Sequence, residues 1–327
     1  MTLRAASIGL GWWSDELAMA VHGKSDAIRI ASCFSRSPDK RAAFAEKFGA
    51  GQHESYEAVL GDPEIDAVLL TTPHSLHGEH IRMAAAAGKH VFVEKPFTLS
   101  AEDGRSAAAA CRDAGVVLAT GHNRRFAPAT IALKRRIEGG EFGTLLHAEG
   151  QFSTPTALSM PPERWRASRG ESPGGAIGSL GIHTIDAMTH LMGPVARLTC
   201  FATRRAVSVD IDDTTSALFE FATGATGYLG TLFATPYTNF LNVYGTKAAA
   251  VVSENYGALT VRPAEGRATA EPLEPIETLR VELEEFAAAC AGTATYRVTP
   301  EEAIHNVAVM EAMVASAAGG GAPQAVG

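Results

Sequence analysis

Two glycines at the end of an apolar run are the first residues that could do chemistry. The stretch "IGLGWWSDE" puts Gly9 and Gly11 before a segment of helical spacing, which is the context of the G-x-G-x-x-G dinucleotide fingerprint. Ser14 replaces the usual third glycine and is small enough for tight helix–strand packing. We expect the glycines to admit a pyrophosphate, with Trp12 and Trp13 packed on the domain or over the cofactor. A purely structural turn is the alternative.

The end of the second apolar segment bears on the choice of cofactor. A cofactor without a 2′-phosphate usually meets an acidic residue here, whereas this chain has Ser35 and Arg36 in "CFSRSPDKR". A hydroxyl and a guanidinium suit a 2′-phosphate because arginine forms charge-assisted hydrogen bonds to it. We therefore predict NADP, with NAD possible. The alternative is that Arg36 is a solvated surface charge.

A lysine in "VEKPFTLS" is the first candidate for proton transfer. Lys95 precedes Pro96, which disfavours helical geometry, and it closes a predicted strand where ligands bind in parallel sheets. Such a lysine could hydrogen-bond a reacting hydroxyl and move its proton. Glu94 is its expected neighbour at the cofactor. A surface lysine ending a strand is the alternative.

A histidine in "GLGIHTIDAM" is the second candidate. Leu180, His183, Ile185 and Met188 have helical spacing, and a neutral imidazole can accept an alcohol proton near neutral pH. A buried core histidine is the commoner case and stays open. Asp186, one turn later, could orient the helix or the histidine.

Strand and helix patterns alternate through the first third of the chain. Pro38 and Gly49 bracket one predicted helix, as helix starts and ends favour. This alternation predicts a parallel sheet with right-handed crossovers. The predicted strands are 4–10, 27–34, 65–73, 90–96 and 116–121, and the predicted helices are 14–23, 37–49, 74–89 and 100–115.

The pattern changes after residue 122. Strand-like runs joined by glycine-containing turns predict a mostly antiparallel sheet, followed by helices over 277–292 and 299–320. We expect a Rossmann domain over 1–122, an α+β substrate-binding and oligomerisation domain over 123–318, and a flexible tail over 319–327.

Four motifs in register resemble the glucose–fructose oxidoreductase / inositol dehydrogenase / MocA family. They are "VLLTTPHSLHGEH", "VEKPFTLS", "GHNRRFAP" and "WRASRGESPGGAIGSLGIHTIDAM". The resemblance covers nearly the whole chain. It implies a Rossmann domain and an open, mostly antiparallel sheet domain that builds a homodimer or homotetramer. It also implies a proton relay of Lys95 and His183, and a cofactor loop with Thr71, Thr72, Pro73 and His77.

Several residues of these motifs could contact the substrate. Asn123 could donate a hydrogen bond, and Arg124 and Arg125 could clamp an anionic group or form structural salt bridges. Trp165 could lie in a substrate lid or at an interface rim. Ser179 stands where the family has an acidic residue four positions before the histidine, which puts a strict lysine–aspartate–histidine triad in doubt.

The expected activity is an NADP-preferring oxidoreductase for a secondary alcohol or ketone on a small polyhydroxylated ring, a sugar or cyclitol. The alternatives are a dehydrogenase of a cyclic dihydrodiol and a non-catalytic nucleotide or ligand sensor. His74, His77 and His80 lack the spacing of a zinc site, and we predict no metal.

Composition limits the remaining possibilities. The 327 residues carry a formal net charge of −8, which argues against a nucleic-acid-binding face, and no apolar run is long enough to span a bilayer. The four cysteines are isolated from one another, as in a reduced, cytoplasmic protein. A small molecule is the expected partner.

Overall fold

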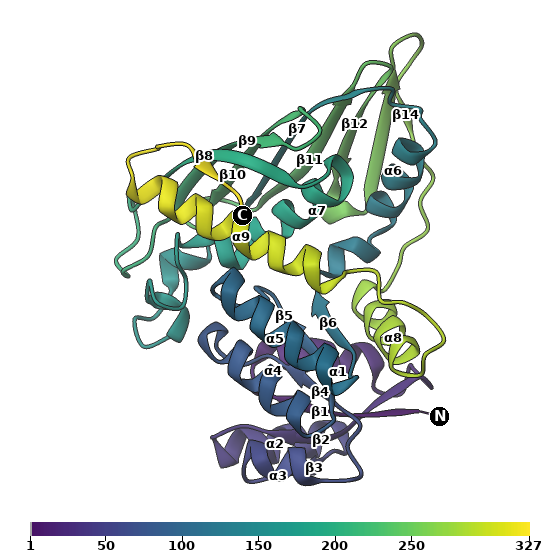
Figure 1. The fold of residues 1–327 in the computed structure, drawn as a ribbon, viewed down its shortest axis with the longest axis vertical. Coiled ribbons are helices and arrows are strands. Elements are labelled where there is room, and N and C mark those ends of the chain that lie inside the picture. Colours follow the sequence, from purple (N-terminus) through teal and green to yellow (C-terminus); the bar gives the residue numbers. More distant parts are fainter. Residues whose placement is uncertain (1) are drawn as a thin grey trace. The chain divides into compact units, whose positions relative to one another are not determined.

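The computed structural model describes residues 2–327, which form two compact units (Figure 1). The first unit runs to Asn123 and takes in Glu277–Ile304, and the second contains Arg124–Ile276 and residues 305–327. Residues 277–304 therefore belong to the first unit, which corrects the second domain of 123–318 expected from the sequence. The reason is packing. Helix α8 (Thr278–Cys290) carries the buried Phe286, whose ring centroid lies 5.7 Å from that of Phe92 in the parallel sheet of the first unit.

The first unit is built on the predicted parallel sheet. Its strand order is β3-β2-β1-β4-β5-β6, with all neighbours parallel. Successive strands are added on one side of β1 up to β3 and on its other side from β4 onward, and ligands bind at the carboxyl ends of the strands at such a switch in strand order. The strands are β1 (Leu3–Ile8), β2 (Ile28–Phe34), β3 (Gly51–Gln52), β4 (Ala67–Leu70), β5 (His90–Glu94) and β6 (Leu118–Gly121).

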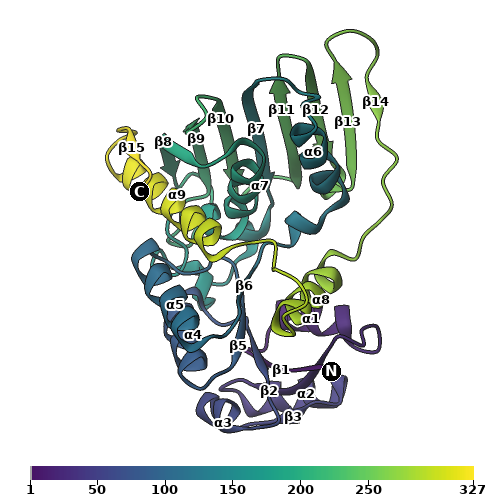
Figure 2. The ribbon, with the colours of Figure 1, turned by 45° about the vertical axis from the view of Figure 1, so that its right-hand side comes forward.

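Helices cover both faces of this sheet. Helices α4 and α5 lie together on one side of it, while α1 and α8 lie together on the other (Figure 2). Local signals set the helix ends: the Ser37 hydroxyl accepts from the Lys40 amide, and Gly49 closes α2 in the left-handed conformation. The helices are α1 (Trp12–Val21), α2 (Pro38–Phe48), α3 (Tyr56–Gly61), the short η1 (His74–Leu76), α4 (His77–Ala86) and α5 (Ala101–Ala114).

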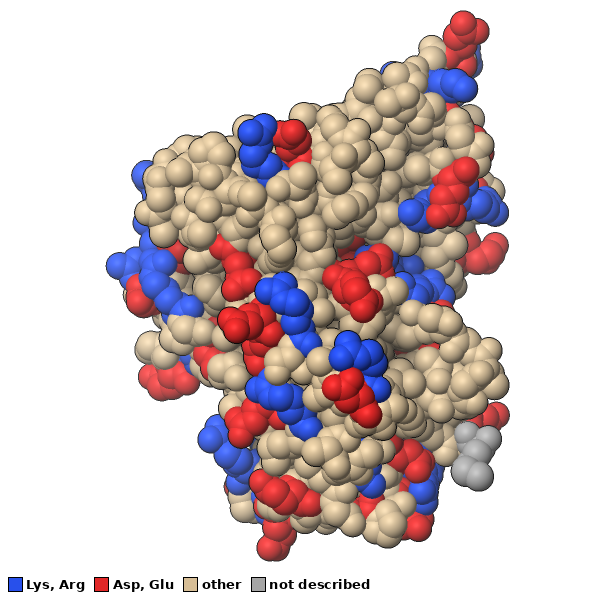
Figure 3. Space-filling view, in the orientation of Figure 1, with Lys and Arg blue, Asp and Glu red and all other residues tan. Residues whose placement is uncertain are grey.

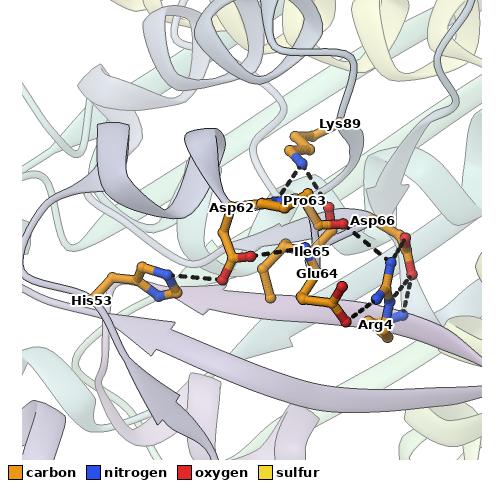
Figure 4. A network of polar contacts seen from close by, with 8 residues as sticks. All are labelled: Arg4, His53, Asp62, Pro63, Glu64, Ile65, Asp66 and Lys89. Carbon is orange, nitrogen blue, oxygen red and sulfur yellow. Dashed lines mark hydrogen bonds and ion pairs between the residues drawn. The ribbon is translucent and has the colours of Figure 1, made fainter.

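A polar network fixes the amino ends of β1 and β4 (Figure 4). Arg4 donates from Nε and Nη2 to the two carboxylate oxygens of Asp66, at 3.0 and 2.8 Å. The Lys89 ammonium donates to the carbonyls of Asp62 and Ile65 at 2.8 and 2.7 Å. These bonds hold the segment that enters β4 and leave the opposite, carboxyl ends of the strands to the candidate site.

The second unit is built on a nine-stranded sheet. Its order is β14-β13-β12-β11-β7-β10-β9-β8-β15, and only β7 and β10 are parallel among its paired strands in residues 2–327. This confirms the mostly antiparallel sheet. The strands are β7 (Leu145–Ser153), β8 (Val195–Thr203), β9 (Thr214–Phe221), β10 (Thr226–Leu232), β11 (Thr238–Gly245), β12 (Ala248–Ser253), β13 (Ala258–Pro263), β14 (Thr269–Ala270) and β15 (Gln324–Ala325).

Helices cover one face of this sheet and leave the other open. Helices α6 (Pro128–Glu138), α7 (Ile182–Met192) and α9 (Pro300–Ala318) lie along the same side (Figure 2). Burial alternates along the strands accordingly: in β9, Ala217 and Phe219 are buried while Leu218 is 57% exposed.

The last residues contain a strand where the sequence predicted a flexible tail. Strand β15 pairs with β8, with Gln324 opposite Leu198. The turn before it is held by the Thr199 hydroxyl, which donates to the Gly321 carbonyl. The end of the chain is ordered by backbone pairing to the edge strand β8. The sequence of a glycine-rich segment gives no sign of such pairing.

Within residues 2–327, no helix combines the length and apolar character needed to cross a membrane.

Candidate active site

The two glycines after β1 differ in what an added side chain would meet. Gly9 has φ +88°, and a Cβ there would lie 2.9 Å from the Thr72 amide nitrogen, so the fold itself requires glycine. A Cβ at Gly11 would meet nothing within 4 Å. Ser14 accepts from the Gly11 amide at 2.8 Å and caps α1. The open space over Gly11, at a helix N-terminus and beside the carboxyl end of β1, fits a dinucleotide pyrophosphate.

The two tryptophans that follow are exposed to different extents. Trp12 is 73% exposed, whereas Trp13 is half-buried, and their ring centroids lie 5.3 Å apart. Trp13 is thus the one that packs on the domain. Trp12 is the one available to a ligand, and its contact with a cofactor stays a prediction.

The end of β2 presents a guanidinium instead of a carboxylate. Arg41 donates from Nη1 to the Ser35 carbonyl at 2.7 Å and so holds the turn. Arg36 is exposed and makes no hydrogen bond or ion pair within the described part of the chain. The first acidic residue after the strand is Asp39, in the first turn of α2.

The loop after β4 is tied to both neighbouring strands. The Thr71 hydroxyl donates to the carbonyl of Gly9 at 2.5 Å, which joins this loop to the glycine turn. His77 is fully buried, with Nδ1 2.9 Å from the Pro96 carbonyl and Nε2 3.0 Å from the Thr72 carbonyl. Burial lowers the pKa of His77 to about 4. Its position favours a bracing role over the direct cofactor contact predicted from the sequence.

Lys95 lies directly after β5. Its amide donates to Oε2 of Glu94 at 3.2 Å, and the Glu94 side chain is buried. A Cβ on Gly121 of β6 would lie 2.8 Å from Glu94 Oε1, so glycine there makes room for this carboxylate. Lys95 and Glu94 therefore lie at the same sheet edge as Gly9, Thr72 and Pro73, the carboxyl ends of β1, β4 and β5.

His183 belongs to the second unit, in the first turn of α7. It is 8% exposed, and its ring centroid lies 6.0 Å from that of Phe152 on β7. A single π-helical turn, η5 (Ile177–Gly181), leads into α7 and carries Ser179. Such turns occur frequently at functional sites. Ser179 lies four residues before His183, the spacing that the family resemblance uses.

The structure separates the two adjacent arginines. Arg125 donates from Nε and Nη2 to the two carboxylate oxygens of Asp186 at 2.8 and 2.9 Å, with both side chains buried. Asn306 of α9 also donates to Asp186 at 2.8 Å. For Arg125 the structure supports the salt-bridging alternative and corrects the anion clamp, and Asp186 anchors α7.

Arg124 has no such acid. Its guanidinium donates to the side-chain oxygens of Asn239 and Asn255 at 3.2 and 3.1 Å and lies over the rings of Phe152 and Tyr256. The sequence alone does not point to Asn239, Asn255 and Tyr256, because no local pattern links them to position 124. Asn123, just before, is half-buried, and its substrate contact stays a prediction.

Trp165 lies in the loop between β7 and η5. It is half-buried, with the Arg166 guanidinium carbon 4.2 Å from its ring centroid. Arg169 anchors this loop through a two-point ion pair with Asp212, at 2.7 and 3.2 Å. The loop is thus fixed at one end, and a lid role for Trp165 stays a prediction.

Residues 2–327 contain no group of three or more histidine, cysteine, aspartate or glutamate side chains that could hold a metal ion. Both ring nitrogens of His77 face backbone carbonyls, so the histidines 74, 77 and 80 do not form a ligand set.

Comparison with known proteins identifies the family of both domains. Residues 3–122 match the oxidoreductase family with an NAD-binding Rossmann fold, Gfo/Idh/MocA, and residues 130–251 match the C-terminal domain of that family. The chain is 31% identical over 307 residues to 1,5-anhydro-D-fructose reductase of Ensifer adhaerens, covering 90% of each protein.

Two solved structures show the same fold. One is a putative NADPH-dependent oxidoreductase of Desulfitobacterium hafniense, with a TM-score of 0.93, 30% identity, and coverage of 100% of this chain and 98% of that one. The other is a levoglucosan dehydrogenase in complex with NADH and levoglucosan, with a TM-score of 0.91, 23% identity and full coverage of both chains. The chain belongs to the Gfo/Idh/MocA family and is an NAD(P)-dependent oxidoreductase acting on alcohol groups.

Proposed function

We propose that the enzyme prefers NADP and oxidises a secondary alcohol on a small polyhydroxylated ring, or reduces the corresponding ketone. The observation that carries this proposal is the open space over Gly11 after the carboxyl end of β1, in a sheet in which Lys95 follows the carboxyl end of β5, two strands away. The reductase from Ensifer adhaerens and the levoglucosan dehydrogenase support a ring substrate, since their names refer to anhydro sugars.

Lys95 and His183 are the residues that we assign to the proton. The bound dinucleotide supplies the hydride chemistry. Lys95 would hydrogen-bond the reacting oxygen, and His183, a nearly buried imidazole, would exchange the proton of the same hydroxyl. Glu94 would stand beside the cofactor. Asn123, Trp165 and Ser179 would contact the ring.

The preference for NADP rests on Arg36. It is an exposed cation with no partner in the described residues, at the strand end where an NAD-specific site has an acid. Relatives named for either cofactor exist: the Desulfitobacterium protein is titled NADPH-dependent, and the levoglucosan dehydrogenase was solved with NADH.

A cyclic dihydrodiol is the second candidate substrate. Ser179 offers a hydroxyl where sugar and inositol dehydrogenases of the family have a carboxylate, so the site is less suited to binding many vicinal hydroxyls. The chain is 27% identical to a mouse trans-1,2-dihydrobenzene-1,2-diol dehydrogenase over 256 residues.

We also propose that the enzyme is a homodimer or homotetramer built through the open sheet face. Phe201 and Leu218, on the neighbouring strands β8 and β9, are 62% and 57% exposed, and Val251, on β12 of the same sheet, is 46% exposed. The surface above β8 to β10 carries few charged side chains (Figure 3). Light scattering tests this assembly: a mass of one 34.3 kDa chain would contradict it.

We place the enzyme in the cytoplasm, because all four cysteines are thiols.

A fluorescence titration with NADPH and NADH tests the cofactor assignment, with Trp12 as the exposed reporter. We expect the wild type to bind NADPH more tightly, and Arg36→Ala to weaken NADPH by roughly 10-fold or more while NADH changes little, because a charge-assisted phosphate bond is lost. Arg29→Ala, an exposed arginine at the opposite end of β2, is the matched control. Equal weakening of both cofactors would remove the 2′-phosphate role, and binding of neither would favour the sensor.

A further inference from the structure

Arg124 is a buried cation without an acidic partner. Arg124 is 7% exposed, and no carboxylate in residues 2–327 forms an ion pair with it. Buried charges in proteins are normally paired with an opposite charge. The adjacent Arg125 follows this rule through Asp186. Arg124 is therefore an exception that calls for a ligand.

The groups around Arg124 attract a cation and leave its charge uncompensated. The guanidinium carbon lies 4.2 Å from the ring centroid of Phe152 and 4.7 Å from that of Tyr256. Aromatic faces stabilise a cation but carry no net charge. The two hydrogen-bond acceptors, on Asn239 and Asn255, are neutral amides. They use two of the five N–H donors of the guanidinium, which leaves the full charge and further donors for an anion.

The backbone holds these neighbours in place at a cost. Glu254, Asn255 and Tyr256 have φ of 50°, 54° and 70°, three successive non-glycine residues in the left-handed region. Non-glycine residues persist in this strained region only where the surrounding structure holds them there. The turn directs the Asn255 side chain to Arg124 and to Asn239, whose Nδ2 donates to the same oxygen at 3.0 Å. Arg124 is thus held in one position, as a preorganised binding group requires.

Arg124 and His183 share a neighbour. The Phe152 ring lies beside the guanidinium of Arg124, and its centroid is 6.0 Å from that of the His183 ring. Tyr237, which is 56% exposed, lies on the same ring at 6.0 Å between centroids. An anion held by Arg124 would therefore belong to the molecule whose hydroxyl reaches His183.

We propose that the substrate is an acidic ring alcohol, a polyhydroxylated ring that carries a carboxylate, and that Arg124 binds the carboxylate. This inference rests on the proposed function. A carboxylate is favoured over a phosphate because one guanidinium neutralises one negative charge, whereas a phosphate dianion would keep a second charge in a mostly apolar site. Arg124 then determines specificity for acid over neutral rings.

Steady-state kinetics with saturating NADP⁺, or NAD⁺, tests the proposal. The probes are D-glucuronate and D-galacturonate against the neutral D-glucose and D-galactose, with D-glucose 6-phosphate as the phosphate arm. We expect kcat/KM to be higher for the hexuronates by on the order of 10- to 100-fold, the range of a charge-assisted hydrogen bond. The preference should decrease in high KCl, because salt screens the attraction.

Two variants separate ligand binding from a structural role. Arg124→Gln should lower kcat/KM for hexuronates far more than for hexoses, mainly through KM, and Arg124→Lys should keep part of the acid preference. Arg262→Gln, which removes an exposed arginine of the same unit, should keep the wild-type ratio. An equal loss for acid and neutral rings in Arg124→Gln would mean that Arg124 only supports the turn, and would overturn the proposal.

The wild-type enzyme gives a result even if a variant does not fold. Preference for the neutral hexoses, or for the 6-phosphate over the hexuronates, overturns the carboxylate assignment while the dehydrogenase stands. Failure to bind either dinucleotide would instead overturn the proposed function, and the titration above detects it separately.

Discussion

Arg125 and Asp186 form a two-point ion pair with 1% and 0% of their side chains exposed. The pair joins the turn after β6 to helix α7, three residues after His183. Removing one member leaves the other buried and uncompensated, which costs about 3–5 kcal/mol. Arg125→Met should therefore lower the free energy of unfolding by roughly that amount, measured by urea denaturation.

An exposed pair provides the control for this prediction. Arg112 and Asp113 are 74% and 70% exposed, and such pairs contribute about 0–1 kcal/mol. Arg112→Met should leave the unfolding midpoint nearly unchanged. Similar losses in the two variants would show that the Arg125–Asp186 pair does not anchor α7.

The two glycines after β1 should respond differently to alanine. Gly11→Ala should fold normally, since its Cβ meets open space, but should bind NADPH at least about 10-fold more weakly because the methyl group occupies the place of the pyrophosphate. Gly9→Ala should lower the melting temperature, since its φ is +88° and its Cβ would clash with Thr72. Tight NADPH binding by Gly11→Ala would place the cofactor elsewhere.

His77 should make stability depend on pH. Its pKa is about 4 in the folded protein and about 6.5 in the unfolded chain. As pH falls, the unfolded chain therefore takes up the proton first. The contribution of neutral His77 to the free energy of unfolding is fully present above about pH 6.5 and is lost as pH falls towards 4. This difference amounts to about 3 kcal/mol. Urea unfolding at about pH 7.5 and about pH 5 measures the loss.

Three half-buried histidines contribute to the same trend, because partial burial also lowers the pKa of His80, His90 and His305. His77→Gln isolates its share: it should be less stable at neutral pH and lose less on acidification. His22→Gln, at an exposed position, should keep the wild-type slope. An unchanged slope in His77→Gln would contradict the assignment.

The features that sequence predicted correctly are local ones. The turn at Gly9, the capped helix α2 and the hairpin between β9 and β10 depend on neighbouring residues, so their patterns are visible in the chain. The parallel pairing of strands in the first sheet follows from the same alternation of short strands and helices.

The features that sequence missed depend on distant contacts. Helix α8 joins the first unit because Phe286 meets Phe92, almost two hundred positions earlier. Arg124 and Arg125 are indistinguishable in "NRRF", and only Asn255 and Asp186 separate them. The final strand depends on the edge of β8, which no pattern in a glycine-rich tail reveals.

The role of Lys95 in an alcohol dehydrogenation is tested by the rate of NADP⁺ reduction with a panel of ring alcohols, in the wild type and in Lys95→Ala, at saturating cofactor. We predict that the wild type turns over at least one ring alcohol, and that Lys95→Ala loses about 10²- to 10⁴-fold in kcat while still binding NADPH, because the proton of the hydroxyl has lost its acceptor. Turnover by Lys95→Ala at the wild-type rate would mean that Lys95 does not move the proton of the reacting hydroxyl.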